Sequence, residues 1–101
     1  MEEMELHPQD DRRLIVLVIY DIVDNKTRLS MVKCLSRYAL RVQKSCFEGF
    51  LTLRQCEQME REASLLIDGA CDSLRVYRVR DSAMVHSWGR GEVKVEDVVI
   101  Y

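Results

Sequence analysis

A lone carboxylate that follows an apolar run is the first candidate for chemistry. Leu14 to Tyr20 is almost entirely apolar, and Asp21 comes directly after it. Such a run, rich in β-branched residues, predicts a central strand covered on both faces, and the end of a central strand holds a carboxylate rigidly. Mg²⁺ binds one or two carboxylates together with water and phosphate oxygens. Asp21 therefore suits Mg²⁺ when a two-fold dimer supplies a second copy of it; the alternative is an acid that caps the next turn.

A block of positive charge follows this acid. Residues 25–47 contain six basic residues and no acid, whereas residues 1–11 contain five acids and no lysine or arginine. The net charge of −2 thus conceals two blocks of opposite sign. Because an ordinary surface helix mixes its charges to gain i,i+4 pairs, an unmixed block favours phosphate binding over a merely solvated face. The basic residues are Lys26, Arg28, Lys33, Arg37, Arg41 and Lys44.

Other residue types give less support for chemistry. The cysteines are Cys34, Cys46, Cys56 and Cys71. They form no C-x-x-C pair, so they do not suggest zinc, and we expect small buried thiols at Cys34 and Cys56. His7 and His86 lie in irregular segments and offer no nucleophile–base pair. No apolar run is long enough to span a membrane and no export signal precedes the first strand, so we expect a cytoplasmic protein without a membrane partner.

The hydrophobic pattern divides the 101 residues into three parts. Residues 1–13 are a polar acidic leader, residues 14–81 are one domain with a single core, and residues 82–101 are a loop followed by one or two late strands. The segment Trp88–Gly91 suits either a connection to a last strand exchanged in a dimer or a binding loop.

Within the domain, strand and helix patterns alternate. A period of three to four residues from about 25 to 40 predicts a helix, capped by Asp24 or Asn25. Residues 41–51 return to strand character and form a hairpin turning near Lys44–Ser45, or else one bent strand. The apolar face of the helix is Leu29, Val32, Leu35 and Ala39, with Met31 and Tyr38 beside them.

A second helix and a further strand complete the domain. Thr52 followed by Gln55 matches a capping box, and Gly69 is placed to end the helix in a left-handed conformation. Residues 72–80 read as a strand. The order predicts an α+β, ferredoxin-like β-α-β-β-α-β domain with an additional C-terminal strand, in which both helices cover one face of an antiparallel sheet. This fold hosts many functions and does not identify one.

Three stretches resemble the CRISPR-associated protein 2 family. They are VLVIYDI before the basic helix, RVQKSCFEG after it, and DSLRVYRV near residue 76, and the likeness covers residues 14–80. The R-V-Q-x-S-x-F-E pattern at residues 41–48 is its most specific element. The resemblance implies a ferredoxin-like homodimer in which two copies of Asp21 face each other and share Mg²⁺. It also implies nucleic-acid contacts from Arg28 and Arg41, and supporting roles at the site for Tyr20, Ser45 and Phe47.

We therefore expect a CRISPR adaptation protein, active in spacer acquisition. It would be a dimeric scaffold that binds DNA or RNA and the integrase, with Mg²⁺-dependent endonuclease activity at Asp21 left open, since no second acid or histidine is an evident general base. The alternative is a ferredoxin-like RNA-binding or regulatory domain without catalysis, which is disfavoured because the strands lack an exposed aromatic pair for base stacking. From the residues alone, Phe47 is a core residue, a stacking platform or a dimer contact.

Overall fold

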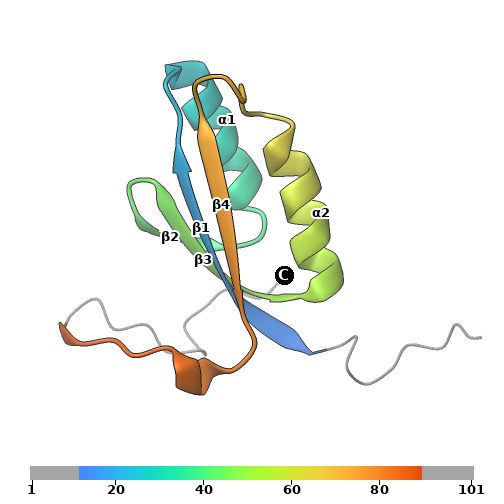
Figure 1. Ribbon diagram of the computed structural model, residues 1–101, viewed down its shortest axis with the longest axis vertical. Helices are drawn as coiled ribbons and strands as arrows, with labels where there is room; N and C mark the ends of the chain where they lie inside the picture. Colours follow the sequence, from blue (N-terminus) through green and yellow to red (C-terminus); the bar gives the residue numbers. More distant parts are fainter. Residues whose placement is uncertain (1–11, 90–101) are drawn as a thin grey trace, which may run out of the picture.

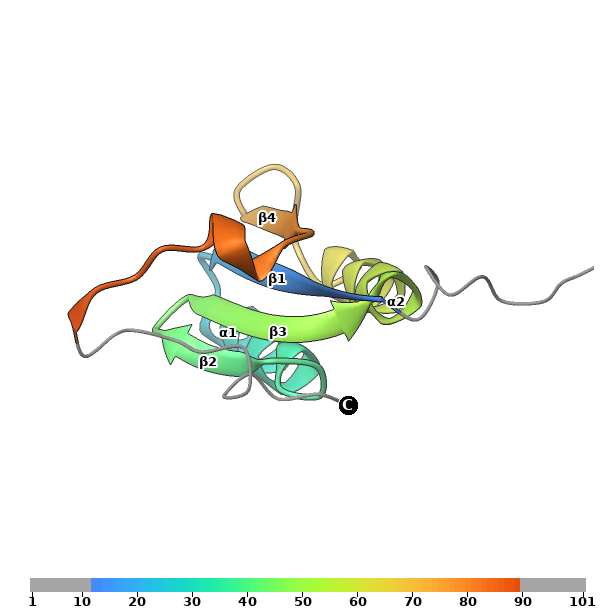
Figure 2. The same ribbon diagram turned by 90° about the horizontal axis from the view of Figure 1, so that it is seen from below.

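The computed structural model describes residues 12–89 and contains the expected order of elements (Figure 1). The elements are β1 (Arg13–Asp21), α1 (Asn25–Leu35), β2 (Leu40–Gln43), β3 (Cys46–Thr52), α2 (Leu53–Ser64), β4 (Ser73–Val79) and the 3₁₀ turn η2 (Ser82–Met84). All neighbouring strands are antiparallel, in the order β2-β3-β1-β4, and Figure 2 shows them side by side in that order. The predicted ferredoxin-like fold is confirmed; the expected leader up to residue 11 and the late strands lie outside the described residues.

Both helices pack against one face of the sheet, and the hydrophobic core lies between the helices and that face. In β1, Val16, Val18 and Tyr20 point toward the helices and are buried, because successive side chains of a strand alternate between faces. On the other face Ile19 keeps 39% of its surface exposed. Ile15, on that same face, is only 7% exposed, so within residues 12–89 the expectation that both faces of this strand are covered holds at Ile15 and fails at Ile19.

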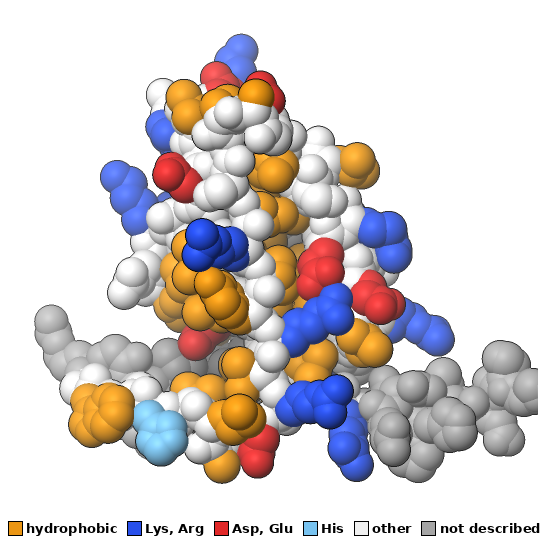
Figure 3. Space-filling view, in the orientation of Figure 1, with side chains coloured by type: hydrophobic (Ala, Val, Ile, Leu, Met, Phe, Trp, Pro, Cys, Tyr) orange, Lys and Arg blue, Asp and Glu red, His pale blue; other side chains and the backbone are white. Residues whose placement is uncertain are grey.

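The uncovered side of the sheet is called the open face here. Its members alternate with the buried residues in the strand registers. Figure 3 shows hydrophobic side chains gathered around a basic one over β4 and the strands beside it. The open face consists of Ile15, Leu17, Ile19 and Asp21 from β1, Cys46, Glu48 and Phe50 from β3, and Arg75, Tyr77 and Val79 from β4.

The first helix is shorter than its periodicity predicts. It ends at Leu35, where the backbone N–H groups of Tyr38 and Ala39 both donate to the Leu35 carbonyl at 2.9 Å. This turn carries Tyr38 and Ala39 into the core, so their apolar character reflects packing after the helix and not a continuation of it. Of the two expected caps, Asp24 and Asn25, the helix uses Asp24, whose carboxylate accepts from the Thr27 backbone N–H at 2.9 Å.

The buried side of α1 also differs from the expected one. Leu29 is 70% exposed, whereas Met31, Cys34 and Leu35 are buried. With 3.6 residues per turn, Leu29 lies roughly 200° around the helix from Met31, which places the two on opposite sides. The spacing i, i+3, i+4 from Met31 is the one that faces the sheet, and the expected position of Leu29 on the apolar face is wrong.

The second helix begins as predicted and ends earlier. The Gln55 backbone N–H donates to the Thr52 hydroxyl at 3.1 Å, and the Thr52 N–H donates to the Gln55 side chain at 2.9 Å, which completes the capping box. The helix ends at Ser64, and Leu66 and Ile67 then pack against the core. Gly69 does not end it, because the chain must turn before Leu66; among the described glycines only Gly89 has a positive φ.

The β2–β3 hairpin is confirmed, with its turn at Lys44–Ser45. Phe47 follows the turn, is fully buried, and has its ring centroid 6.3 Å from that of Tyr20, so it is a core residue. Two residues on, a Cβ on Gly49 would meet Ala39 at 3.1 Å, which explains the glycine. No helix within residues 12–89 is long and apolar enough to cross a membrane.

Candidate metal and nucleic-acid site

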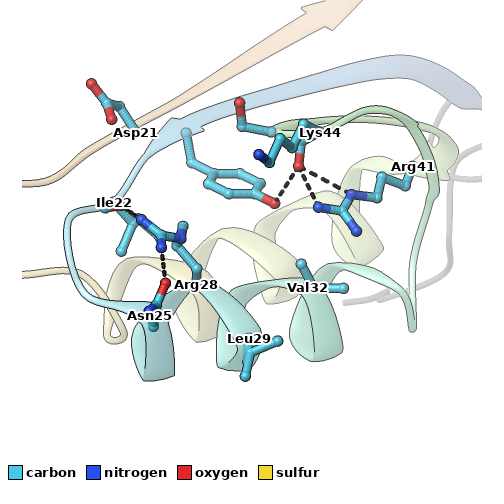
Figure 4. Close-up of a pocket in the computed structure, with 10 residues that line it drawn as sticks. Asp21, Ile22, Asn25, Arg28, Leu29, Val32, Arg41 and Lys44 are labelled. Carbon is cyan, nitrogen blue, oxygen red and sulfur yellow. Dashed lines mark hydrogen bonds between the residues drawn. The ribbon is translucent and has the colours of Figure 1, made fainter.

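A cleft of about 600 Å³ lies between α1 and the β2–β3 turn (Figure 4). It gathers residues that are far apart in the sequence, because the end of β1, the first turns of α1 and the hairpin turn meet at one end of the sheet. The lining residues are Tyr20, Asp21, Ile22, Asn25, Arg28, Leu29, Val32, Arg41, Lys44 and Ser45. The cleft thus brings together the predicted acid with three of the predicted cations, Arg28, Arg41 and Lys44.

Asp21 borders this cleft but does not point into it. In Figure 4 its carboxylate lies on one side of β1, and the Arg28 guanidinium lies on the other. The alternation of the strand explains this, since Tyr20 is buried toward the helices and its neighbour must face the opposite way. Asp21 is exposed, and within residues 12–89 its carboxylate accepts no hydrogen bond. It is therefore free to bind a ligand on the open face.

Arg28 reaches back to the loop that follows Asp21. Its Nη1 donates to the carbonyl oxygens of Ile22 at 2.9 Å and Val23 at 3.2 Å, and its Nη2 donates to Asn25 Oδ1. A guanidinium at these positions ties the first turn of α1 to the end of β1. Arg28 is thus a brace for the loop as well as a cation of the cleft.

Asp72 holds the same loop from the other side. Its Oδ1 accepts from the Val23 backbone N–H at 3.0 Å, and its Oδ2 accepts from the Asp68 N–H at 2.9 Å. Both hydrogen bonds lower the pKa of the Asp72 carboxyl, and the bond from the Asp68 N–H has the larger effect. Val23 therefore has its N–H held by Asp72 and its carbonyl held by Arg28. We call this pair the Arg28–Asp72 clamp, and it fixes the backbone directly after Asp21.

Arg41 and Tyr20 meet at the hairpin turn. Arg41 donates to the Lys44 carbonyl from Nε at 3.0 Å and from Nη2 at 2.6 Å, and the Tyr20 hydroxyl donates to the same oxygen at 3.2 Å. The Ser45 carbonyl accepts from the Tyr20 backbone N–H at 3.2 Å. Tyr20 and Arg41 thereby hold the turn in place, while the side chains of Lys44 and Ser45 stay exposed beside the cleft.

The remaining predicted site residues lie apart from the cleft. Lys26 and Lys33 are exposed on α1 and do not line it. Arg37 donates to Glu62 of α2 at 2.7 Å and stacks over the Tyr38 ring at 5.6 Å. The acid that was missing from the local sequence is therefore supplied to Arg37 by the other helix.

Sequence reasoning missed three residues on the open face: Glu48, Arg75 and Tyr77. They share that face with Asp21 because of the strand registers, and the alternation of β3 and β4 was the signal that could have placed them there. Glu48 Oε1 is buried and accepts no hydrogen bond within residues 12–89, and burial raises the pKa of its carboxyl. No group of three or more His, Cys, Asp or Glu residues that could hold a metal ion occurs in this described range.

An antiparallel sheet with two helices on one face, a free acid at the end of β1 and a cationic cleft beside it define a ferredoxin-like protein with a candidate phosphate-binding cleft. The sequence profile described as CRISPR associated protein Cas2 matches residues 14–86, and the chain belongs to that family. The endoribonuclease Cas2 of Mycobacterium tuberculosis H37Rv is 42% identical over 91 residues, covering 88% of this chain and 79% of the relative.

Two solved structures share the fold and much of the sequence. The crystal structure of a hypothetical protein from Thermus thermophilus has a TM-score of 0.69 and 36% identity, covering 80% of this chain and 96% of that one. The crystal structure of Streptococcus pyogenes Cas2 has a TM-score of 0.63 and 28% identity, covering 74% of this chain and 99% of that one. At these identities the likeness extends beyond the fold and agrees with the family assignment.

Proposed function

We propose that this chain acts in CRISPR adaptation as a dimeric scaffold that binds nucleic acid and the integrase, and that two copies of Asp21 bind Mg²⁺ and support endonuclease activity on RNA or DNA. The observation that carries the proposal is the free carboxylate of Asp21, held at the end of a central strand and facing the open side of the sheet. Family membership supports it, since Mycobacterium tuberculosis relatives are named endoribonucleases.

The open face supports the dimer. Ile19 is 39% exposed and Tyr77 is 44% exposed, and no described helix covers them. Two sheets that pack face to face bury such residues in a layer about 10 Å thick. A second copy of the same face is the simplest cover, because a two-fold interface uses one patch twice.

The carboxylate of Asp21 suits Mg²⁺ only when a second protomer supplies another copy of it. Asp21 is the carboxylate on the open face at this end of the sheet, whereas the nearby Asp24 already accepts from the backbone and hydroxyl of Thr27. Two facing copies of Asp21 give the two carboxylates that Mg²⁺ takes alongside water and phosphate oxygens. When bound, the ion supplies positive charge to a phosphate group under attack. The chain itself contributes the position of each carboxylate, through the Arg28–Asp72 clamp.

The cations give affinity for the phosphate backbone. Arg41 and Lys44 line the cleft, and Lys26 and Lys33 extend the positive charge along α1. Charges of this kind bind nucleic acid without reading its sequence. No group of three or more His, Cys, Asp or Glu residues occurs within residues 12–89, and Asp72, which lies near the end of β1, already accepts from the backbone N–H groups of Val23 and Asp68. No residue is therefore an evident general base, and we infer that scaffolding is the main cellular role and that cleavage is slow.

Asp21→Asn tests the proposal, since it keeps the shape and removes the charge from both halves of the dimer. We expect Mg²⁺-dependent cleavage to be lost, duplex DNA binding to persist, and spacer integration in cells to continue. The folded dimer should be no less stable without metal, because two close carboxylates repel each other. Thermal melting, a DNA-binding titration, a cleavage assay and an integration assay measure the four quantities.

Asp24→Asn is the matched control. It removes a carboxylate three positions away, while asparagine still serves as an N-cap, so cleavage should be retained. Unchanged cleavage in Asp21→Asn would place the chemistry elsewhere. Loss of integration in a folded, DNA-binding Asp21→Asn dimer would show that catalysis is required and would overturn the primacy of the scaffold role.

A further inference from the structure

Glu48 has a buried carboxylate oxygen without a partner in the described part of the chain. It lies in the middle of β3 on the open face, and its Oε1 is buried and accepts no hydrogen bond within residues 12–89. Burial alone raises the pKa of its carboxyl, and no neighbouring cation offsets this. Buried polar groups are nearly always hydrogen-bonded, and a carboxylate left unpaired is costly. A donor from outside the single chain would resolve the conflict.

Donors of the right kind stand on the same face, two strands away. Leu17 of β1 pairs with Glu48 on one side and with Tyr77 on the other, so the three residues form one row across the sheet. Arg75 lies two residues before Tyr77 on the same face of β4, and its Nη1 donates to the Tyr77 hydroxyl at 3.5 Å. Arg75 is exposed and has no ion pair with an acid in the described part of the chain. Neighbouring strands are about 4.8 Å apart, so β1 separates the carboxylate from these donors by about 10 Å.

The proposed dimer determines what Glu48 meets. Two copies of Asp21, at the end of β1, face each other only if the two-fold axis passes beside that end. If the two-fold axis runs along β1, the two sheets stack over their whole length. If the axis instead runs across the strands, the sheets overlap only at the ends of their strands, and most of the open face stays uncovered. Since β3 and β4 lie on either side of β1, the first arrangement places β4 of the second copy over β3.

We propose that Glu48 of each protomer pairs with Arg75 of a second copy, next to the Tyr77 hydroxyl of that copy, and that these two symmetric ion pairs set the register of the two sheets. The inference rests on the proposed dimer and adds to it the residues that select the partner. A carboxylate and a guanidinium are a matched hydrogen-bonding pair, and the symmetry forms the contact twice. Such pairs specify which arrangement of an apolar interface is adopted.

Charge reversal in separate chains tests the pairing. Glu48→Arg sets two cations against each other at both contacts, and Arg75→Glu does the same with two acids, so each variant alone should raise the dimer dissociation constant about 100-fold or more. In an equimolar mixture, a protomer carrying Glu48→Arg and a protomer carrying Arg75→Glu form opposite-charge pairs at both contacts. The mixture should therefore recover a dimer, measured by analytical ultracentrifugation, with affinity within about tenfold of the original.

The controls separate this inference from the dimer itself. Circular dichroism melts check that each variant is folded, and Glu48→Gln with Arg75→Gln provides a milder pair in case a reversal unfolds the chain. Glu57→Arg, on the exposed side of α2, should leave dimerisation unchanged. If the folded reversal variants dimerise like the original chain, or stay monomeric when mixed, the pairing is overturned while the dimer stands. If the original chain is monomeric at every concentration, the proposed dimer and the pairing both fail.

Discussion

The two faces of the sheet follow different rules. On the covered face Val16, Val18, Phe47 and Leu51 are completely buried and apolar, and together with the helices they account for the fold. On the open face, apolar residues whose exposed fraction ranges from 7% at Ile15 to 44% at Tyr77 share the surface with charged residues, among them Asp21, Glu48 and Arg75. Within residues 12–89 nothing pairs with the buried Oε1 of Glu48 on that face. The covered face therefore specifies the fold, whereas the open face carries the residues that the proposed dimer would use.

The largest expected effect contrasts two phenylalanines of β3. Phe47→Ala should destabilise the protein by about 3–5 kcal/mol, because it leaves a cavity in a closed core. Phe50→Ala, on the open face, should cost less, and its cost should rise with protein concentration if the proposed dimer buries Phe50 further. Urea unfolding of both variants at several protein concentrations measures the difference.

The contrast between these variants can fail in two ways. A concentration-dependent loss in Phe47→Ala would mean that the covered face also contributes to association. A loss in Phe50→Ala that is equal at all concentrations would mean that the open face stabilises the single chain and has no need of a partner. The distinction between the two faces would then be one of degree.

Local rules predicted the beginnings of the helices well and the end of α1 poorly. Thr52 with Gln55, and Asp24 with Thr27, were predictable because each cap depends on residues close in sequence. The end of α1 was not, because Ala39 continues the apolar period although tertiary packing buries it after the helix has ended. Periodicity identifies apolar positions but does not tell whether a helix or a turn buries them.

The candidate site was predicted as a set of residues but not as an arrangement. Arg28 and Asp21 are close in sequence, yet they lie on opposite sides of β1, as strand alternation after the buried Tyr20 requires. The ion pair of Arg37 with Glu62 spans 25 residues and depends on how the helices pack. Asp72 escaped prediction for the same reason, since it acts on a loop 49 residues away.

The next effect concerns the loop where the two faces meet. Asp72→Asn leaves a single acceptor oxygen for the N–H groups of Val23 and Asp68, so the variant should melt at a lower temperature at pH 7. Because these bonds lower the pKa of the Asp72 carboxyl in the folded state, its contribution is present above the ordinary value of 3.8 and is lost as the pH falls through the lower folded value. The difference in melting temperature should therefore close at the acid end of a pH series.

The same variant should also weaken the proposed metal site without changing the fold. If the Arg28–Asp72 clamp positions Asp21, Asp72→Asn should need more Mg²⁺ for half-maximal cleavage, while its DNA affinity stays the same. Asp68→Asn is the matched control, because Asp68 contributes its backbone N–H to Asp72 and keeps it in the variant. An unchanged Mg²⁺ requirement in Asp72→Asn would limit the clamp to a structural role.

The smallest expected effects are on the salt dependence of DNA binding, and they test whether the cleft on the helix side of β1 binds phosphate independently of the open face. Arg41→Gln should lower DNA affinity for all sequences and reduce the slope of log K against log salt by about 0.9, the value for one phosphate contact with duplex DNA. Arg28→Gln should do the same and, through the loss of its bonds to Ile22 and Val23, also raise the Mg²⁺ requirement. Arg61→Gln removes an equal charge from exposed α2, away from the cleft, and should leave the slope unchanged. A slope that responds equally to all three variants would show that only net charge matters, and the cleft would lose its assignment as the phosphate-binding side.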